Sequence, residues 1–378
     1  MKFLAADLIL NAPNPLTGTP TPDHEKLRQT VAWAEFAEQV GFDAVGIGER
    51  HTRPFLSSAP AVVLSHIAAR TSRVRLLTTV AVLPLLDPLR VAEDYATVDH
   101  LSEGRVELVI GKGNDPHQNE LFGYDLSDQW ERNRENYELL RRLWTEESVT
   151  WSGRYRPDLV EATSLPRPYQ ESIRVWHGSA SSTESTELAA RWGDPLFSAN
   201  GFHPLETYGR LVDHYRERYE HHGHGPGASA LVGAGAGGLY VARTTQEAVE
   251  TYRPFYEAFL QTPAAKHNKT PFTDLDDMLE RGPALVGSPQ QVLDKLHRYH
   301  EAFGHEVLSI GIDGVGVSEA QQKDSLELFF AEVAPVLRRE IPSRVWNEEP
   351  AVTERSLTGS GRTADGEAAN VALVGAGR

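Results

Sequence analysis

The 378-residue sequence contains no cysteine, which excludes disulfide bonds, thiolate metal sites and cysteine nucleophiles. This composition is typical of a protein in a reducing cytoplasm, the location that we expect. Long hydrophobic runs are also absent, because no stretch approaches the roughly 20 apolar residues of a transmembrane helix. Residues 3–10 are mostly apolar, but Asp7 interrupts them and no small-residue cleavage site follows, so they predict a strand rather than a signal peptide.

Basic residues are in short supply. Lysine and arginine number 37 against 53 aspartates and glutamates, for a formal net charge of −16. Binding to nucleic acid or to an anionic membrane requires clustered basic residues that neutralise phosphates. The balance therefore argues against both kinds of partner, and any phosphate site must be local and built from a few residues.

Short apolar segments alternate with amphipathic helical patterns along most of the chain. The predicted strands span residues 3–10, 44–48, 74–82, 106–110, 173–176, 195–199, 231–242 and 307–312. Eight strands that are each followed by a helix predict a parallel sheet with right-handed crossovers. At this length we expect the sheet to close as a (β/α)8 TIM barrel over residues 1–345.

Two segments lie outside this pattern. Residues 261–283 form a polar excursion, which we interpret as an insertion near the C-terminal third of the barrel. Residues 346–378 are rich in Gly, Ser, Thr, Ala and Glu, and this composition predicts a disordered C-terminal tail.

The segment 101–114 carries the strongest local signal. A β-branched strand ends at Gly111-Lys112-Gly113, followed by Asn114. The glycines permit close approach of a ligand, and the lysine offers a point charge suited to a phosphate at the carboxyl edge of a parallel sheet. The alternative interpretation is a tight turn with a solvated lysine.

A run of small hydroxyl residues follows the strand that ends at His177 and Gly178. Residues 179–183 are Ser-Ala-Ser-Ser-Thr and open a helix, so backbone N–H groups and hydroxyls converge there. An anion at the helix start explains several hydroxyls in a row, whereas simple N-capping requires only one.

Titratable side chains also follow predicted strands. His51 and His177 both lie at strand ends, where the chemistry of a barrel belongs, although a histidine there is often only a hydrogen-bonded structural residue. Arg50 does not lose its proton and is therefore a candidate to hold an anionic oxygen or to pair with Glu49.

Two further motifs imitate known sites. Residues 233–238 satisfy the dinucleotide pattern G-x-G-x-x-G, but a strand-like segment follows where a helix is required. Their glycines either make room beside a flat ligand or belong to a loosely packed strand. The cluster His221-His222-Gly223-His224 ends a predicted helix, where histidine suits the dipole, so we expect no metal site there.

Taken in order, several segments resemble the bacterial luciferase-like, flavin-dependent monooxygenases between residues 3 and about 337. The segment 175–179 resembles an actinobacterial branch of that family. The remaining motifs are Ala34-Glu35, Gly41-Phe42-Asp43-Ala44-Val45, Ala68-Ala69-Arg70-Thr71-Ser72-Arg73-Val74-Arg75-Leu76, Leu83-Pro84, Asp87-Pro88, Ala92-Glu93-Asp94, Asp99-His100-Leu101-Ser102-Glu103-Gly104-Arg105 and Val286-Gly287-Ser288-Pro289.

The resemblance implies a (β/α)8 barrel that binds FMN at its carboxyl face, usually as a homodimer. Phosphate contacts would map to Lys112, Ser179 and Ser182, beside Gly113, Asn114 and Gly178. An often cis peptide under the flavin ring would map to Thr79-Val80. The family's paired histidines appear here as Arg50-His51; the first of the pair is catalytic in light-emitting members, so we do not expect light emission or long-chain aldehyde oxidation.

These inferences predict a two-component monooxygenase in which a separate reductase supplies reduced FMN and O2 is the co-substrate. The candidate catalytic residues are His51, Arg50 and His177: a histidine would hold a proton, and the arginine would anchor an anionic small-molecule substrate. The alternatives are a deazaflavin-dependent dehydrogenase on the same barrel and a flavin-binding barrel without catalysis.

Overall fold

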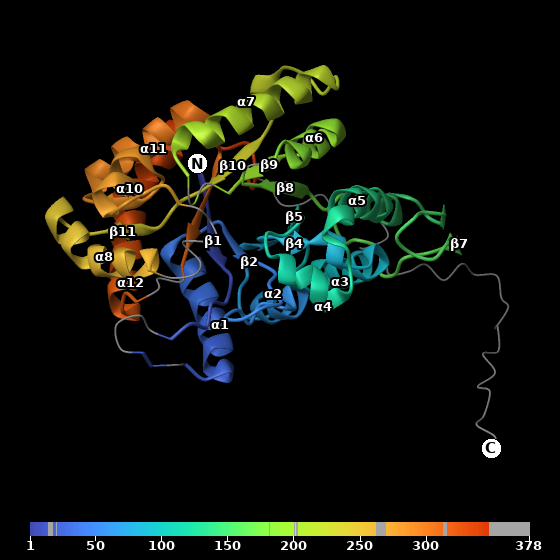
Figure 1. Cartoon of the computed structure of the whole chain (residues 1–378), viewed down its shortest axis with the longest axis horizontal. Helices are drawn as coiled ribbons and strands as arrows, with labels where there is room; N and C mark the ends of the chain where they lie inside the picture. Colours follow the sequence, from blue (N-terminus) through green and yellow to red (C-terminus); the bar gives the residue numbers. More distant parts are fainter. Residues whose placement is uncertain are drawn as a thin grey trace.

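The computed structural model describes residues 1–13, 18–19, 21–180, 182–199, 201, 203–261, 270–312 and 316–347. Eight parallel strands form a closed barrel, in the order β3-β2-β1-β13-β10-β9-β8-β5, with β5 pairing back to β3. They are β1 (Lys2–Asp7), β2 (Ala44–Ile47), β3 (Arg75–Thr78), β5 (Val106–Gly111), β8 (Val175–Ser179), β9 (Leu196–Ser198), β10 (Val232–Gly235) and β13 (Val307–Gly311). The predicted (β/α)8 TIM barrel is confirmed (Figure 1).

Helices surround the barrel and return the chain between successive strands (Figure 1). The longer ones are α1 (Asp23–Val40), α2 (Pro60–Ala68), α3 (Pro88–Leu101), α5 (Gln129–Thr145), α6 (Thr183–Trp192), α7 (Leu205–His221), α8 (Thr245–Leu260), α11 (Pro289–Phe303) and α12 (Glu319–Leu328). The shorter ones are α4 (Pro116–Phe122), α10 (Leu275–Arg281), α13 (Ala334–Glu340), three 3-10 turns, η1 (Leu83–Leu85), η2 (Leu126–Asp128) and η3 (Gly227–Ser229), and one π-helical turn, η4 (Phe329–Val333).

Side-chain caps explain where several helices begin. Asp87 accepts hydrogen bonds from the Leu89 and Arg90 amides, and Ser288 accepts one from the Gln291 amide. At Ser318 the cap is a complete capping box, in which the Ser318 side chain accepts from the Gln321 amide and the Gln321 side chain accepts from the Ser318 amide. Each cap satisfies backbone N–H groups that lack partners within the helix.

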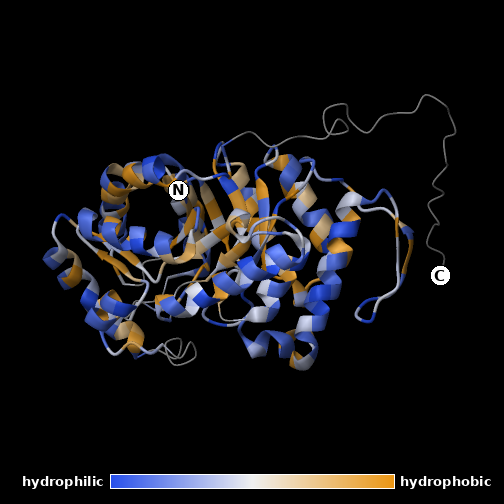
Figure 2. Ribbon diagram, turned by 90° about the horizontal axis from the view of Figure 1, so that it is seen from above, coloured by the Kyte–Doolittle hydropathy of each residue, from blue (hydrophilic) through white to orange (hydrophobic). Residues whose placement is uncertain are grey.

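The core has two layers around the barrel wall. The larger apolar cluster lies between the strands and the helices. A second apolar cluster fills the barrel interior and includes Leu4, Leu77, Val109, Trp176 and Phe197. Figure 2 shows the apolar residues on the central strands and the hydrophilic ones on the outer faces of the helices. The filled interior makes the barrel a packed core rather than a pore, so ligands must bind at its ends.

Two predicted strands are each split in the structure. The predicted strand 231–242 breaks into β10 and β11 (Leu239–Val241), because Gly238 adopts a φ of +125° and Gly237 leaves no room for a side chain. β11 pairs with β12 (Leu285–Gly287) outside the barrel. The predicted strand 74–82 breaks into β3 and β4 (Ala81–Val82) at a cis peptide, Thr79-Val80.

Local segments outside the barrel were predicted less well. The polar excursion 261–283 contains α10, which packs with α8 and β12 around a separate apolar cluster; residues 262–269 lie outside the described part of the chain. An antiparallel hairpin of β6 (Val149–Trp151) and β7 (Leu159–Ala162) was not expected. The predicted tail lies outside the described residues from 348 onwards. None of the described helices is both long and apolar enough to cross a bilayer.

Lys295 on α11 is buried, with 5% of its surface exposed, and Nζ donates to the Leu279 carbonyl at 2.6 Å. Burial, helped by Arg298, lowers the pKa of Lys295 from 10.5 to about 7. Between these two values the unfolded chain binds more protons, so stability should rise with pH by up to about 1.4 kcal/mol per pH unit. Below pH 7 the penalty on the folded state is fully present.

We therefore expect Lys295→Met to raise the free energy of unfolding at pH 7 by about 1–3 kcal/mol, after the loss of one hydrogen bond. The gain should shrink towards pH 10, and urea unfolding across this range measures it. Lys323→Met on α12 is the control, because that lysine is ion-paired to Glu319 at the surface. Equal stability of wild type and Lys295→Met at pH 7 would contradict the prediction.

Candidate functional site

The predicted phosphate contacts come from two adjacent strands. β5 and β8 are hydrogen-bonded neighbours, and their register pairs Ile110 with His177. Lys112 and Ser179 each follow two residues later, so they lie next to each other at the carboxyl end of the barrel. The register therefore brings together the strand ends that carry Lys112 and Ser179, two of the predicted phosphate contacts.

The cis peptide Thr79-Val80 lies beside the same strand ends. A Cβ atom at Gly178 would lie 2.7 Å from Val80 Cγ1, and one at Gly111 would lie 3.0 Å from Val80 Cγ2. On the other side, a Cβ atom at Gly48 would lie 2.7 Å from the Thr79 carbonyl oxygen. Glycines on β5, on β8 and after β2 thus make room for this peptide, which forms part of the floor of the barrel mouth.

His51 belongs to a buried pair with Glu49. His51 Nε2 lies 2.8 Å from Glu49 Oε1, and the two side chains are 11% and 1% exposed. The other carboxylate oxygen of Glu49 accepts from the Val82 amide at 2.7 Å, and the Glu49 amide donates to the Val80 carbonyl at 3.0 Å. Glu49 therefore ties His51 directly to the segment that carries the cis peptide.

Arg50 points towards the loop after β5 rather than towards Glu49. Its Nη1 donates to Asn114 Oδ1, and its guanidinium lies 5.3 Å from the centre of the Phe55 ring. Burial lowers the pKa of Arg50, while nearby Asp115 raises it. The expected ion pair with Glu49 is not formed, because His51 occupies that carboxylate. Arg50 instead joins the loops after β2 and β5 at the mouth.

Lys112 is partly buried at the predicted phosphate position. Its Nζ donates to the Gly113 carbonyl at 3.2 Å and lies 5.6 Å from the centre of the Trp130 ring. Burial lowers the pKa of Lys112, and the negative charge of Glu184 opposes that shift. Glu184 therefore lies close enough to act on Lys112, a neighbour that the sequence reasoning missed.

The serines at the start of α6 bond mainly to one another. Ser179 Oγ donates to the Ser182 carbonyl at 2.8 Å, and Ser182 Oγ caps the Ser185 amide. Ser182 Oγ also lies 2.9 Å from Glu184 Oε2. An incoming phosphate must therefore compete with the Glu184 carboxylate for the Ser182 hydroxyl and for Lys112.

We expect Glu184→Gln to tighten binding of a phosphate-bearing cofactor several-fold, because it removes a like charge from the site. Fluorescence titration with FMN measures the effect, and Glu187→Gln, one turn further along α6, is the matched control. Weaker FMN binding by Glu184→Gln would show that the carboxylate does not oppose the ligand.

His177 does not face the barrel mouth, which corrects the expectation for this residue. It is 1% exposed, its Nε2 lies 3.1 Å from Asp194 Oδ2, and its ring packs edge-on against Tyr137 of α5 at 4.8 Å. Its neighbour Trp176 fills the barrel interior, so His177 points outwards into the layer between sheet and helices. We therefore remove His177 from the candidate reacting groups.

The other sequence motifs are accounted for structurally. His222 Nε2 lies 2.8 Å from Glu187 Oε1, and Arg218 bonds to the same carboxylate, whose pKa is lowered to about 2, chiefly by Arg218. No group of three potential metal ligands occurs among the described residues. The glycine run 233–238 covers the end of β10 and the turn to β11, with no helix after it.

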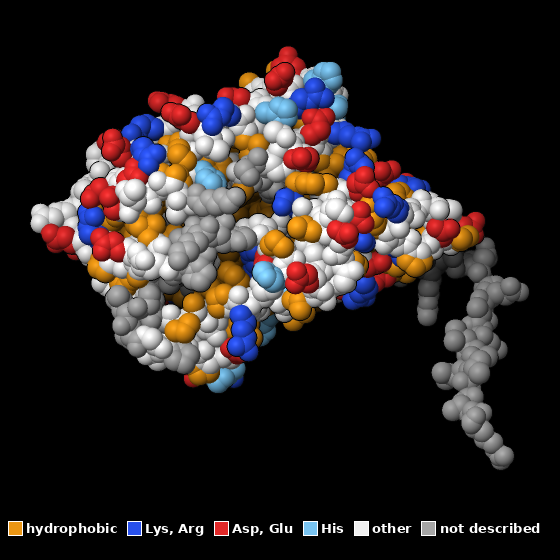
Figure 3. Space-filling view, viewed as in Figure 1, with side chains coloured by type: hydrophobic (Ala, Val, Ile, Leu, Met, Phe, Trp, Pro, Cys, Tyr) orange, Lys and Arg blue, Asp and Glu red, His pale blue; other side chains and the backbone are white. Residues whose placement is uncertain are grey.

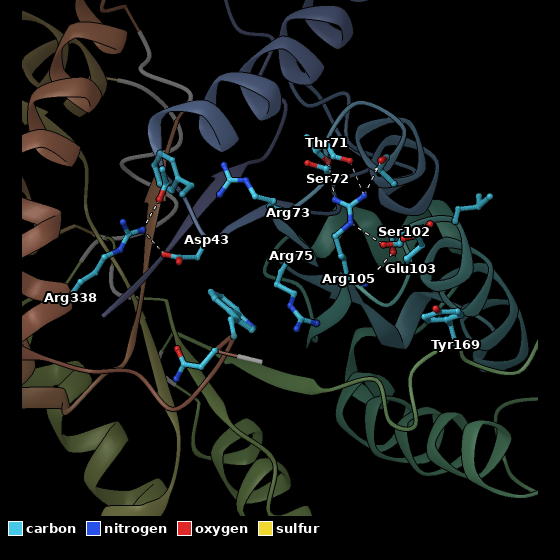
Figure 4. A pocket seen from close by; sticks show the side chains of 16 residues that line it. Asp43, Thr71, Ser72, Arg73, Arg75, Ser102, Glu103, Arg105, Tyr169 and Arg338 are labelled. Carbon is cyan, nitrogen blue, oxygen red and sulfur yellow. Dashed lines mark hydrogen bonds and ion pairs between the residues drawn. The ribbon is translucent and has the colours of Figure 1, made fainter. Parts of the chain in front are cut away.

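A cavity lined by several arginines lies at the opposite, amino end of the barrel (Figure 4). Residues 181, 200, 202 and 313–315, which follow β8, β9 and β13 in the sequence, lie outside the described part of the chain. Glu49, His51 and Lys112 lie at the carboxyl end, the end at which (β/α)8 barrels carry their chemistry. Figure 3 shows charges of both signs interspersed over one face, without a broad basic patch.

Comparison with known proteins gives a consistent family. Residues 1–306 match the model of the luciferase-like monooxygenases. A curated relative, 4-hydroxyprotoasukamycin monooxygenase from Streptomyces nodosus subsp. asukaensis, is 29% identical over 320 residues, which cover 80% of this chain and 84% of the relative.

Solved structures share the fold over nearly their whole length. The monooxygenase RslO1 from Streptomyces bottropensis superposes with a TM-score of 0.76 at 25% identity, covering 89% of this chain and 99% of the other. The oxygenating constituent of 3,6-diketocamphane monooxygenase from Pseudomonas putida, in complex with FMN, superposes with a TM-score of 0.72 at 22% sequence identity. The match covers 89% of this chain and 98% of the other. An F420-dependent secondary alcohol dehydrogenase superposes with a TM-score of 0.68 at 16% sequence identity, and the match again covers 89% of this chain and 98% of the other.

Proposed function

The chain belongs to the luciferase-like monooxygenase family, and we propose that it is a two-component monooxygenase that oxidises a small organic substrate with O2 and FMN reduced by a separate reductase. The observation that carries the proposal is the juxtaposition of Lys112 with the strand end that opens α6, at the same end of the barrel as the Glu49–His51 pair. The Pseudomonas putida neighbour, solved with FMN, supports the choice of cofactor.

The residues present fit a flavin mononucleotide. Lys112 supplies a cation and α6 supplies an amino-terminal helix end, both suited to a phosphate. The floor at Val80 is kept open by Gly111 and Gly178, whose Cβ atoms would crowd the valine side chain. Thr79 Oγ1 is buried without a hydrogen-bond partner among the described residues and is therefore available to a ligand.

Each side chain at the mouth has a separate task in this proposal. Reduced FMN, when bound, supplies the activation of O2. His51 donates from Nε2 to Glu49, which leaves Nδ1 to exchange a proton with the reacting groups, and the Phe122 ring, 4.8 Å from the imidazole centre, shields the histidine from water. Arg50 attracts an anionic group of the substrate, because its charge persists at any working pH.

One experiment separates this function from its alternatives. The purified protein is supplied with NADH, FMN and a generic flavin reductase, and candidate substrates are screened for oxygenated product. Product formation that depends on O2 supports the monooxygenase. Turnover with a reduced deazaflavin and without O2 would favour the dehydrogenase, an alternative that the F420-dependent neighbour keeps open. Tight FMN binding without turnover of any kind would favour the non-catalytic barrel.

Lys112→Ala should weaken FMN binding about 10-fold, the equivalent of roughly 1.4 kcal/mol. Equilibrium dialysis against FMN and against riboflavin measures the effect, which should be confined to FMN because riboflavin lacks the phosphate. Lys26→Ala is the control, because Lys26 lies on α1 and not on the strand ends β5 and β8 that carry the proposed phosphate site. Equal losses for the two ligands would remove Lys112 from the phosphate site.

We further propose that the protein acts in the cytoplasm as a homodimer, as the resemblance implies. Sedimentation equilibrium tests the dimer: a mass near twice 41.8 kDa is expected, and a concentration-independent mass of one chain would refute it.

A further inference from the structure

Phe122, the last residue of α4, presents an open aromatic ring beside His51 at the carboxyl end of the barrel. The residue is 39% exposed, and its ring centre lies 4.8 Å from that of His51, with the two ring planes at 77°. A single exposed apolar residue needs no explanation elsewhere on a protein surface. Here the ring touches the histidine that the proposed function places among the reacting groups, so the substrate must come close to it.

Two hydrogen bonds hold α4 against the segment that carries His51. Gln118 Oε1 accepts from the His51 amide at 3.2 Å. The Asp115 carboxylate, which caps α4, also accepts from Thr52 Oγ1. The position of Phe122 relative to the histidine is therefore set by the helix as a whole and does not depend on the contact between the two rings alone.

A row of stacked planes supports the Phe122 ring. The Tyr124 ring lies 6.3 Å from it at an interplanar angle of 25°. The Arg132 guanidinium lies 4.1 Å from the centre of the Tyr124 ring and 4.5 Å from that of Tyr155. Stacked aromatic pairs and cation–π pairs attract each other. Phe122 is thus held as a rigid aromatic surface, and a ligand that covers it has little of the protein to order.

A second exposed apolar side chain reaches the same segment from the other side. Leu8, which follows β1, is 36% exposed, and a Cβ atom at Gly48 would collide with Leu8 Cδ2. In the barrel, β2 lies between β1 and β3, and β5 comes next after β3. Segment 48–51 therefore has an apolar side chain from the loop after β1 on one flank and Phe122 on the other.

There is room for a ligand across the mouth from Phe122. β13 lies opposite β5, since three strands separate them in each direction round the barrel. Ile310 packs between sheet and helices, so the next residue, Gly311, faces the barrel interior. A Cβ atom at Gly311 would meet no atom of the described residues within 4 Å. A ligand that lies against Phe122 can therefore extend over the mouth.

We propose that the substrate presents a rigid, mostly apolar ring system to Phe122 and Leu8, and that Phe122 determines this preference. The inference rests on the proposed function, since it takes His51 to meet the substrate. A flat ring covers a fixed aromatic surface and has no rotatable bonds to order, whereas an open chain of equal carbon number loses rotational freedom when it binds. The structure thus favours fused aromatic or alicyclic compounds over long-chain ones.

Equilibrium dialysis of the full-length protein, with saturating oxidised FMN, against two ketones of equal carbon number tests the proposal. 1-Tetralone carries a fused aromatic ring, and 2-decanone is an open chain. We expect Phe122→Ala to weaken binding of 1-tetralone about 10-fold and binding of 2-decanone less than three-fold. Phe122→Tyr keeps the ring and should restore the wild-type affinity for 1-tetralone. Leu101→Ala is the control, because Leu101 is 62% exposed at the opposite end of the barrel.

Three results would overturn the proposal: no saturable binding of 1-tetralone by the wild type, unchanged affinity in Phe122→Ala, or equal losses for the two ketones. Phe122→Leu, which keeps an apolar side chain without the ring, serves in the same comparison if Phe122→Ala does not fold. Dialysis requires neither reductase nor O2. Absence of oxygenated product would therefore refute the monooxygenase and leave the ring preference standing, whereas equal losses for the two ketones would do the reverse.

Discussion

Replacing Glu49 by glutamine is expected to lower kcat for substrate oxygenation about 100-fold while leaving FMN affinity within two-fold of wild type. The buried carboxylate is the only group recorded at His51 Nε2 among the described residues, and it fixes which ring nitrogen faces the mouth. A glutamine keeps the volume but replaces the charged acceptor of the Nε2–H bond with a neutral amide, which weakens the bond that orients the ring. Rapid-quench measurement of product separates this effect from flavin binding.

The matched controls are Glu35→Gln, which alters an ion pair with Arg70 on the outer helices, and His51→Gln. If Glu49 acts only through His51, the double variant should be no slower than His51→Gln alone. Normal product yield in Glu49→Gln would contradict the role given to the pair. A loss of FMN binding equal to the loss of kcat would instead mark Glu49 as a structural support of the mouth.

The barrel was predictable because its signals are local and repeated. Each barrel strand is short and apolar, and glycine or proline marks many of the boundaries, such as Gly41 after α1 and Pro88 at the start of α3. The split at Gly238 was not predicted, because an apolar run has the same appearance whether or not its backbone turns. At Thr79-Val80 the pattern of residues predicted a continuous strand, and only the family resemblance implied a cis peptide there. Pairing of β11 with β12 joins residues more than forty positions apart, which periodicity does not reveal.

The sequence predicted where the candidate site residues lie on the barrel, but it did not predict which side chains contact one another there. Parallel neighbours place Lys112 beside Ser179, as barrel geometry requires. The proximity of Glu184 to Lys112 depends on how α6 leaves β8, and the sequence carries no sign of it. The orientation of His177 could have been predicted from the sequence. Successive side chains of a strand point to opposite faces of the sheet, so if Trp176 fills the barrel interior, His177 points towards the helices.

The corrected position of His177 leads to a large predicted effect on stability. Asp194 is 13% exposed and accepts hydrogen bonds from His177 Nε2, Tyr137 OH and Arg141 Nη1, the last at 3.0 Å. The pKa of Tyr137 is raised far above 10, by burial and then by the charge of Asp194, so the phenol stays protonated and donates. One carboxylate thus joins α5 to β8 and to the segment that precedes β9.

Asp194→Ala should therefore lower the free energy of unfolding by about 3–5 kcal/mol, because it leaves a buried phenol, a buried imidazole and a partly exposed arginine without their shared acceptor. Asp194→Asn keeps one acceptor oxygen and should therefore lower the free energy of unfolding by less than Asp194→Ala.

His177→Gln should lower the free energy of unfolding, measured in urea, by about 1–3 kcal/mol. Below its melting temperature this variant should keep the FMN affinity and the kcat of the wild type. If His177→Gln instead abolishes oxygenation at unchanged stability, the histidine reaches the reacting groups, and the assignment of proton transfer to His51 alone must be abandoned.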